Sequence, residues 1–310
     1  MPKTSSITAA PQAYRASELI TAGTTRRRLR ARDVRRAAHG IVLHPHCALD
    51  LEDYRDRCLA IGQSLKKEFF LSHRSAATLY RIPTPRPPTQ QIEVASFAPL
   101  RAPRHREILG HRVRSGVLEW NSAHGLVLPS PADVWCQLSA VLSLQRLVAA
   151  GDFLISGPLI LGSGGRREPP LAPVESLHAA HQRHRGTKGS RLRELALPML
   201  RTPVDSPQES LLRLEIIAAR FDEPVVNCPI AVERRTLHAD LGYPSLRIAI
   251  DYEGAHHFDD PRQVRLDEER RKLLHAAGWV WIRVTAQTMR DLRGFFAELS
   301  AAIARADASK

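Results

Sequence analysis

The pattern of apolar and polar positions is clearest over the last hundred residues. Helical periodicity, with its start and stop signals, predicts helices at 206–221, 261–277 and 287–304. Short apolar runs bounded by turn residues predict strands at 228–232, 237–241, 247–252 and 279–284. The order helix, three strands, helix, strand, helix predicts a mixed sheet flanked by helices.

The first fifty residues combine two short helical segments with a pair of strands. Residues 15–22 form a helix candidate that Gly23 stops, and Thr24 and Thr25 can cap a second helix over 26–32. A strand pair is predicted within 34–43. Two helices, the second rich in arginine, followed by a β-ribbon describe a winged helix-turn-helix module, which we expect at 1–50.

The middle of the chain mixes helices, strands and a linker. Helices are predicted at 53–68, 72–80 and 132–150, and strands at 92–94 and 108–113. The Gly/Pro-rich stretch 156–173 predicts a linker, and the helical segment 174–200 is broken at Gly186 and Gly189. We therefore expect an α/β chain (α+β overall) with an α+β domain at 51–155, a linker with connecting helices at 156–204 and the mixed-sheet domain at 205–304.

Composition excludes several classes of protein. Of the 310 residues, 43% are hydrophobic and 25% charged, which permits a packed core and excludes wholesale disorder. No apolar run is long enough to span a membrane, and the first residues lack the apolar stretch of a secretory signal. The four cysteines are far apart without a Cys-x-x-Cys pair, which favours a reducing cytoplasm over a disulfide framework or a zinc finger.

Charge is divided unevenly along the chain. The formal net charge is +13, yet residues 206–310 carry 15 Lys and Arg against 16 Asp and Glu, which leaves a net charge of +14 on residues 1–205. A high-GC genome would inflate Arg throughout, but it does not explain this division. A polyanion such as DNA is the better explanation. The candidate DNA contacts surround the second predicted helix and are Arg26, Arg27, Arg28, Arg30, Arg32 and Arg36.

Four carboxylates fall at the ends of predicted elements: Glu209, Asp240, Asp251 and Glu253. Asp251 and Glu253 are two residues apart on one strand, so both face the same side of the sheet. Crowded carboxylates repel each other unless a cation lies between them, and hard oxygen ligands suit Mg²⁺ or Mn²⁺. The alternatives are solvated strand ends and, for Glu209, a capping box begun by Ser206.

These acids belong to a longer series of motifs that resembles the PD-(D/E)XK nuclease superfamily, in the branch similar to very-short-patch-repair endonucleases. The resemblance covers about 205–304 and implies a restriction-endonuclease-like fold and a metal-dependent DNA endonuclease. It makes Asp240 the central metal ligand, Asp251 the first acid of the (D/E)-x-K pair and Glu209 the acid on the helix. The residues that carry it are Asp240, Asp251-x-Glu253-Gly254, His256-His257, Gln263, Asp267, Arg271 and Gly278-Trp279-x-x-Ile282-Arg283-Val284.

Two departures from the superfamily pattern concern the catalytic pair. Glu253 stands in place of the usual Lys, and the Glu-x-Asp order of the branch is reversed to Asp-x-Glu. We expect Asp240, Asp251 and Glu253 to bind the metal ion. The candidates for orienting water and balancing charge in place of Lys are His257, Gln263 and Lys272.

The first half has a second resemblance. Residues 19–43, 72–77 and 128–138 are similar to the winged-helix start and later landmarks of AbiEi-type antitoxins and related regulators. This resemblance implies an alternative function, a transcriptional regulator or antitoxin-like DNA-binding protein with a degenerate nuclease domain. A structure-specific repair nuclease or nickase is a third possibility. DNA is the expected partner, together with a second copy of the chain or a protein of a defence or repair system.

Overall fold

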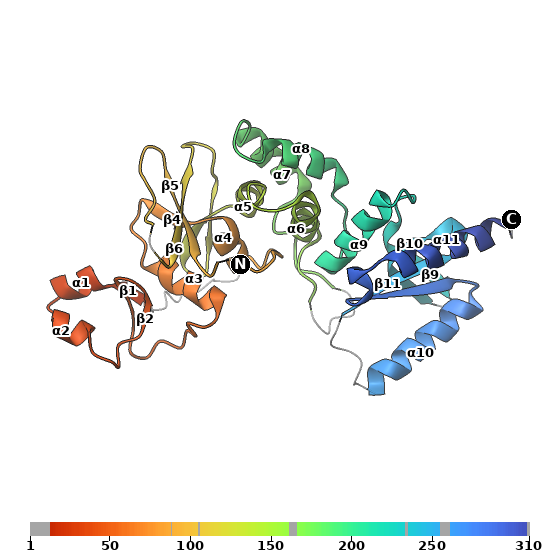
Figure 1. Ribbon diagram of the computed structural model, residues 1–310, viewed down its shortest axis with the longest axis horizontal. Coiled ribbons are helices and arrows are strands. Elements are labelled where there is room, and N and C mark those ends of the chain that lie inside the picture. Colours follow the sequence, from red (N-terminus) through yellow and green to blue (C-terminus); the bar gives the residue numbers. More distant parts are fainter. Residues whose placement is uncertain are drawn as a thin grey trace, which may run out of the picture. The chain divides into compact units, whose positions relative to one another are not determined.

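A computed structural model describes residues 13–87, 89–104, 106–160, 166–232, 235–254 and 261–308, although the side chains of 261–264 and 266 lie outside that description. The chain divides into two compact units, one within 1–150 and 171–197 and the other within 151–170 and 198–310 (Figure 1). None of the helices in the described ranges is both long enough and apolar enough to cross a membrane.

The first unit begins with a small three-stranded antiparallel sheet and two short helices. The sheet has the order β1-β3-β2. The two helices and the β2–β3 ribbon confirm the predicted elements, whereas β1 was not predicted. The second helix is a single turn, since like charges four residues apart, such as Arg26 and Arg30, oppose its extension. The elements are β1 (Ala13–Arg15), α1 (Ala16–Thr21), α2 (Arg26–Leu29), β2 (Arg36–Ala38) and β3 (Ile41–Leu43).

The remainder of the first unit contains a second sheet and a hairpin. In the second sheet, β4 (Phe69–Leu71) is antiparallel to β5 (Ile92–Phe97), which is parallel to β6 (Ile108–Val113). Strands β7 (Trp120–Ala123) and β8 (Leu126–Pro129) form the hairpin. The helices are α3 (Tyr54–Gln63), α4 (His73–Leu79), α5 (Pro131–Leu138), α7 (Val174–Arg183) and α8 (Ser190–Ala196), and α6 covers Leu144–Ser156.

The single helix predicted at 132–150 is instead two helices, α5 and α6. A buried arginine explains the break: Arg193 of α8 donates hydrogen bonds to the carbonyl of Cys136 (3.2 Å) and the hydroxyl of Ser139 (2.6 Å) at the end of α5. Gly189, with φ +83°, precedes α8, and a Cβ there would lie 2.2 Å from the Ser139 hydroxyl. The predicted break of the 174–200 segment between Gly186 and Gly189 is confirmed.

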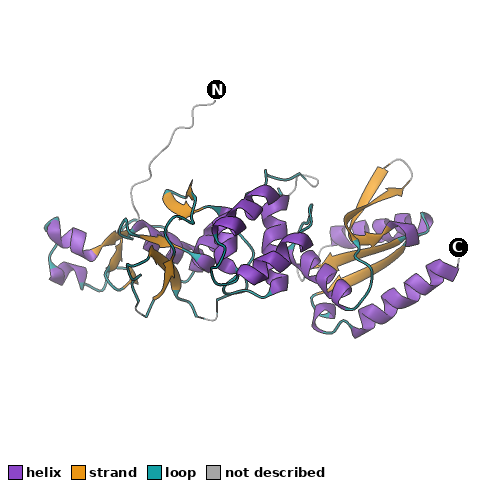
Figure 2. Cartoon of the chain, turned by 90° about the horizontal axis from the view of Figure 1, so that it is seen from above, coloured by secondary structure: helices purple, strands orange, loops and turns teal. Residues whose placement is uncertain are grey.

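The second unit is the predicted mixed sheet flanked by helices (Figure 2). Its strand order is β12-β11-β10-β9; β11 and β12 are parallel, and the other pairs are antiparallel. The helices are α9 (Pro207–Ala218), α10 (Pro261–Ala276) and α11 (Arg293–Ala308), and the strands are β9 (Val225–Val232), β10 (Arg235–Tyr243), β11 (Ile248–Glu253) and β12 (Val280–Thr285). Short 3₁₀ turns cover Leu197–Met199, Pro244–Leu246 and Thr288–Arg290.

Helices cover both faces of this sheet, which explains why β11 begins with an uninterrupted apolar run. On one face, Ile250 of β11 packs in a cluster with residues of α9 and α11. On the other, Ala249 packs with Cys228 of β9 and Leu274 of α10. Asp251 follows this buried run directly and is itself buried. The fold therefore places an acidic side chain at the end of a fully buried strand segment.

Candidate functional site

The site of the second unit is built on neighbouring strands. Strands β10 and β11 are antiparallel with Leu241 opposite Ile250, so the next residues, Asp240 and Asp251, lie side by side. The Asp240 amide donates a hydrogen bond to Oδ1 of Asp251 (3.0 Å), and the Tyr252 amide donates one to Oδ2 of Asp240 (2.7 Å). Both aspartates are therefore fixed by the sheet backbone.

Burial and like charge act together on these carboxyls. Burial, reinforced by the charges of Glu209 and Asp251, raises the pKa of Asp240 to about 8. Burial, with the charge of Asp251 acting in the same direction, raises the pKa of Glu209 to about 7, against the lowering effect of Ser206 and Arg167. The fold thus brings Glu209, Asp240 and Asp251 together from α9, β10 and β11, and we call these three the carboxylate cluster.

Glu209 has two roles in the structure. The Ser206 hydroxyl accepts a hydrogen bond from the Glu209 amide (3.3 Å) at the start of α9, as a helix cap does. Oε2 of Glu209 accepts a hydrogen bond from the Asp205 amide (2.9 Å). The same carboxyl contributes to the raised pKa of Asp240. Capping and membership of the carboxylate cluster therefore coexist.

Two cations lie beside the carboxylate cluster: Arg167, whose charge acts on Glu209, and Arg270 of α10, which contacts Asp251. Arg270 Nε (3.0 Å) and Nη2 (2.8 Å) both donate to Oδ2 of Asp251, and Nη2 also donates to the carbonyl of His238 (2.6 Å). Trp281 Nε1 donates to the same Asp251 oxygen (2.8 Å). The sequence interpretation assigned neither Arg270 nor Trp281 to the site. The available signal was the spacing of Arg270 and the buried Leu274, which are four apart and share one helix face.

Glu253 lies on the same strand but has a different partner. Its Oε1 accepts a hydrogen bond from Nη1 of Arg283 (3.1 Å), whose guanidinium lies over the Trp281 ring at 5.3 Å. Among the described contacts, none joins Glu253 to the carboxylate cluster. Its assignment as a metal ligand stays a prediction.

Of the three residues proposed to replace the motif Lys, only Lys272 has a side chain that the structure describes. His257 lies outside the described residues, and so does the side chain of Gln263, whose backbone belongs to α10. Lys272 is exposed and faces Glu268 at 3.8 Å. Over the described ranges, no group of three or more His, Cys, Asp or Glu side chains that could hold a metal ion is found.

The predicted DNA contacts lie on the first unit and are exposed. Arg28 forms a two-point ion pair with Asp33, with both distances 2.8 Å, and Arg36 donates to the carbonyl of Leu29. The other four, which have no side-chain partner within the described residues, are Arg26, Arg27, Arg30 and Arg32. A hollow of about 710 Å³ is lined by Thr25, Arg27, Arg28, Arg30 and Ala31. The basic character predicted for this module is therefore present at its surface.

Comparison with known proteins adds no family to this description. No protein-family model matches the chain, and no curated protein matches it. We therefore infer the function from the geometry of the two units. The charges of Glu209 and Asp251 raise the pKa of Asp240, and the charge of Asp251 raises that of Glu209, so a divalent cation or a proton would balance charge at this place.

Proposed function

We propose that the chain is a metal-dependent DNA endonuclease, acting in the cytoplasm, that hydrolyses phosphodiester bonds at the carboxylate cluster. The observation that carries this proposal is the convergence of Glu209, Asp240 and Asp251 in one buried place with raised pKa values for the first two. Acids arranged in this way cost stability when ionised, and a function that requires their charge explains why they are kept. All four cysteines are buried and none is joined to another by a disulfide, as expected for a reducing cytoplasm.

All three side chains offer carboxylate oxygens, the ligand type that a hard divalent cation such as Mg²⁺ or Mn²⁺ prefers, although the described residues do not present them as a ready-made metal-binding group. Of the described residues, none donates a hydrogen bond to Oδ1 of Asp240. Glu209, Asp240 and Asp251 would hold the ion, with Glu253 as the further ligand that the sequence predicts. When bound, the ion would act as a Lewis acid and lower the pKa of a coordinated water.

The chain's own residues position this chemistry. Backbone amides of Asp240 and Tyr252 orient the two aspartates. Arg270 balances the charge of Asp251 through Oδ2, while Oδ1 of Asp251 accepts the Asp240 amide hydrogen bond. We assign Arg270 as the positioning residue that the sequence motif lacks in the form of Lys.

DNA binding is proposed for the arginines around α2. Arg26, Arg27, Arg30 and Arg32 are exposed, and the surrounding half of the chain has an excess of positive charge. Such side chains neutralise backbone phosphates without reading sequence. A second copy of the chain, or a protein of a defence or repair system, would complete the assembly.

One observation favours the alternative, a DNA-binding regulator with a degenerate nuclease domain. Asp251 is already neutralised by Arg270 and bonded to Trp281, so the carboxylate cluster can exist without a metal ion. In that function the second unit would serve as a folded platform.

Incubation of the full-length protein with supercoiled plasmid and linear duplex, in Mg²⁺, Mn²⁺ or EDTA, separates the two functions. The endonuclease proposal predicts nicked or linear products with either metal and none in EDTA. Cleavage by the wild type that is matched by Asp240→Asn would indicate a contaminating nuclease. Binding of duplex without cleavage in any metal would support the regulator.

A further inference from the structure

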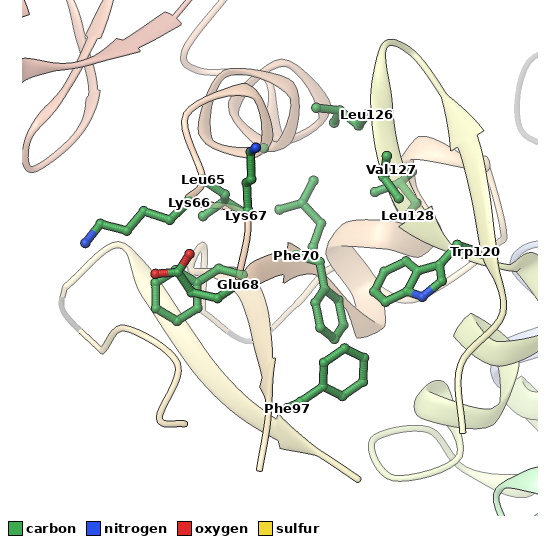
Figure 3. Close-up of a pocket in the computed structure, with 13 residues that line it drawn as sticks. Leu65, Lys66, Lys67, Glu68, Phe70, Phe97, Trp120, Leu126, Val127 and Leu128 are labelled. Atoms are coloured by element: carbon green, nitrogen blue, oxygen red, sulfur yellow. The ribbon is translucent and has the colours of Figure 1, made fainter. Parts of the chain in front are cut away.

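The first unit contains an apolar pocket that the proposed function does not use. It has a volume of about 420 Å³ and lies between the end of α3, strand β4 and the β7–β8 hairpin (Figure 3). Figure 3 shows Phe70, Phe97 and Trp120 grouped on one side, with Lys67 at the rim and Lys66 extending outward. A pocket of this size falls in the range of small-molecule and nucleobase sites.

On the aromatic side of the pocket, the rings pack against one another and leave part of Trp120 uncovered. The Trp120 ring makes T-shaped contacts with Phe70 (5.0 Å between centroids, 89°) and Phe97 (5.9 Å, 86°). The same tryptophan is 45% exposed, and Val127 at the mouth of the pocket is 66% exposed. An aromatic ring that is packed against two others and remains partly exposed to solvent is suited to stacking against a flat partner.

The opposite wall is held by close packing. A Cβ on Gly62 of α3 would lie 2.8 Å from Cδ1 of Leu126 and 2.9 Å from Cδ1 of Leu71, so these two leucine side chains fill the space beside α3 that the glycine leaves free. Every lining residue belongs to the first unit. The pocket is therefore a feature of one folded unit and not of an adjustable boundary.

The charge at the rim indicates what the pocket accepts. Lys66 and Lys67 are two of the six lysines in a chain whose other cations are arginines, and neither has an acidic partner within the described residues. Glu68 beside them is the acidic lining residue. A neutral aromatic side chain of a protein partner would not interact with the two ammonium groups. A nucleotide offers a flat base for the aromatic rings and an adjacent phosphate for the lysines.

We infer that this pocket binds one unpaired nucleobase of single-stranded or locally opened DNA, stacked on Trp120, with neighbouring phosphates on Lys66 and Lys67. The inference deepens the proposed DNA binding and rests on it for the class of polymer. It adds that the protein discriminates unpaired from paired bases through a site separate from the arginines around α2.

The test measures binding of full-length protein in EDTA to an oligothymidine, an abasic oligomer of the same length and a duplex. Trp120→Ala should weaken oligothymidine binding about ten-fold, within the range for loss of one stacked base, and leave the abasic oligomer and the duplex unchanged. Trp120→Phe should restore most of the affinity. Leu195→Ala, which removes a side chain of similar exposure (43%) outside the pocket, is the matched control.

Equal oligothymidine affinity for Trp120→Ala and wild type would overturn the inference, as would an equal loss of abasic-oligomer binding. If Trp120→Ala fails to fold, Val127→Glu at the exposed mouth replaces it and should also weaken oligothymidine binding; unchanged affinity overturns the inference. Duplex binding or cleavage by a protein that shows no preference for an unpaired base would overturn this inference and leave the endonuclease proposal standing.

Discussion

Two carboxyls make the second unit sensitive to pH. Burial beside like charge raises the pKa of Asp240 to about 8 and that of Glu209 to about 7, whereas both are ordinary acids in the unfolded chain. The folded state therefore binds more protons than the unfolded state between pH about 4 and about 8. Without metal, the free energy of unfolding of this unit should fall as pH rises through that range.

Asp240→Asn removes the titrating group but keeps an oxygen that can accept the Tyr252 amide hydrogen bond. In EDTA at pH 9 we expect this variant to be more stable than wild type by at least about 1 kcal/mol, which is ~4 °C or more in the melting temperature of the second unit. At pH 5, where Asp240 is protonated, the two should melt together. Melting curves that shift in parallel at both pH values would contradict the raised pKa.

Arg270 is the residue that balances Asp251, and Arg270→Gln tests its importance. Loss of the charge-assisted bonds to a mostly buried carboxylate should cost about 2 kcal/mol in EDTA. Adding millimolar Mn²⁺ should stabilise Arg270→Gln more than it stabilises the wild type, because in the variant the ion can balance the charge of Asp251 in place of Arg270. The control is Arg271→Gln, whose partner Glu268 is exposed, and which should leave stability nearly unchanged. Equal losses in the two variants would refute the assignment.

The start of α9 contains a residue, Glu209, that both caps the helix and belongs to the carboxylate cluster. In Glu209→Gln, the amide oxygen can still accept the Asp205 amide hydrogen bond, so the helix cap should survive. If the negative charge of Glu209 serves hydrolysis, turnover should fall at least about ten-fold while the melting temperature holds or rises. Normal turnover in this variant would restrict Glu209 to capping.

Helix α2 and its surroundings allow a test of DNA contacts by salt dependence. Arg27 and Arg30 are exposed without a described partner, whereas Arg28 is paired with Asp33. Arg27→Ala with Arg30→Ala should flatten the slope of log K against log[salt] by up to about 1.8, because each phosphate contact contributes ~0.9 on duplex DNA. Arg28→Ala alone should change the slope less than either of the other single changes. An unchanged slope in the double variant would remove these arginines from the DNA interface.

The elements also show what the sequence could and could not predict. The mixed sheet and its flanking helices were predictable because their periodic segments are long and end in glycine or proline. The three-residue strand β4 was not, since it pairs with β5 more than twenty residues further along the chain. The hairpin β7–β8 is a local pairing around His124 and Gly125, and the sequence interpretation missed that turn. The break between α5 and α6 depends on Arg193, more than fifty residues away in sequence. The acids of the site could be found in the sequence as a motif. The contacts of Arg270 and Trp281 with Asp251 could not, because they arise only when α10 and β12 pack beside β11.

We propose that the first unit of the molecule binds DNA and that the second hydrolyses it. The basic excess lies in residues 1–205, and the carboxylate cluster lies in the second unit. We expect the two functions to separate in steady-state kinetics. Arg27→Ala with Arg30→Ala should raise KM and spare kcat, and Asp240→Asn should lower kcat with duplex affinity in EDTA preserved. A fall of kcat alone in the arginine variant would contradict this division.

Calorimetric titration of Mn²⁺ into the full-length protein tests the carboxylate cluster most directly. At pH 7, burial and neighbouring like charge favour the protonated forms of Asp240 and Glu209, so an ion that binds there must displace protons. Titrations in two buffers with different ionisation enthalpies measure that release. We expect the wild type to bind Mn²⁺ and to release protons as it does so. Asp240→Asn should show neither the binding nor the proton release. Absence of Mn²⁺ binding by wild type, or equal binding and proton release by the variant, would contradict this expectation.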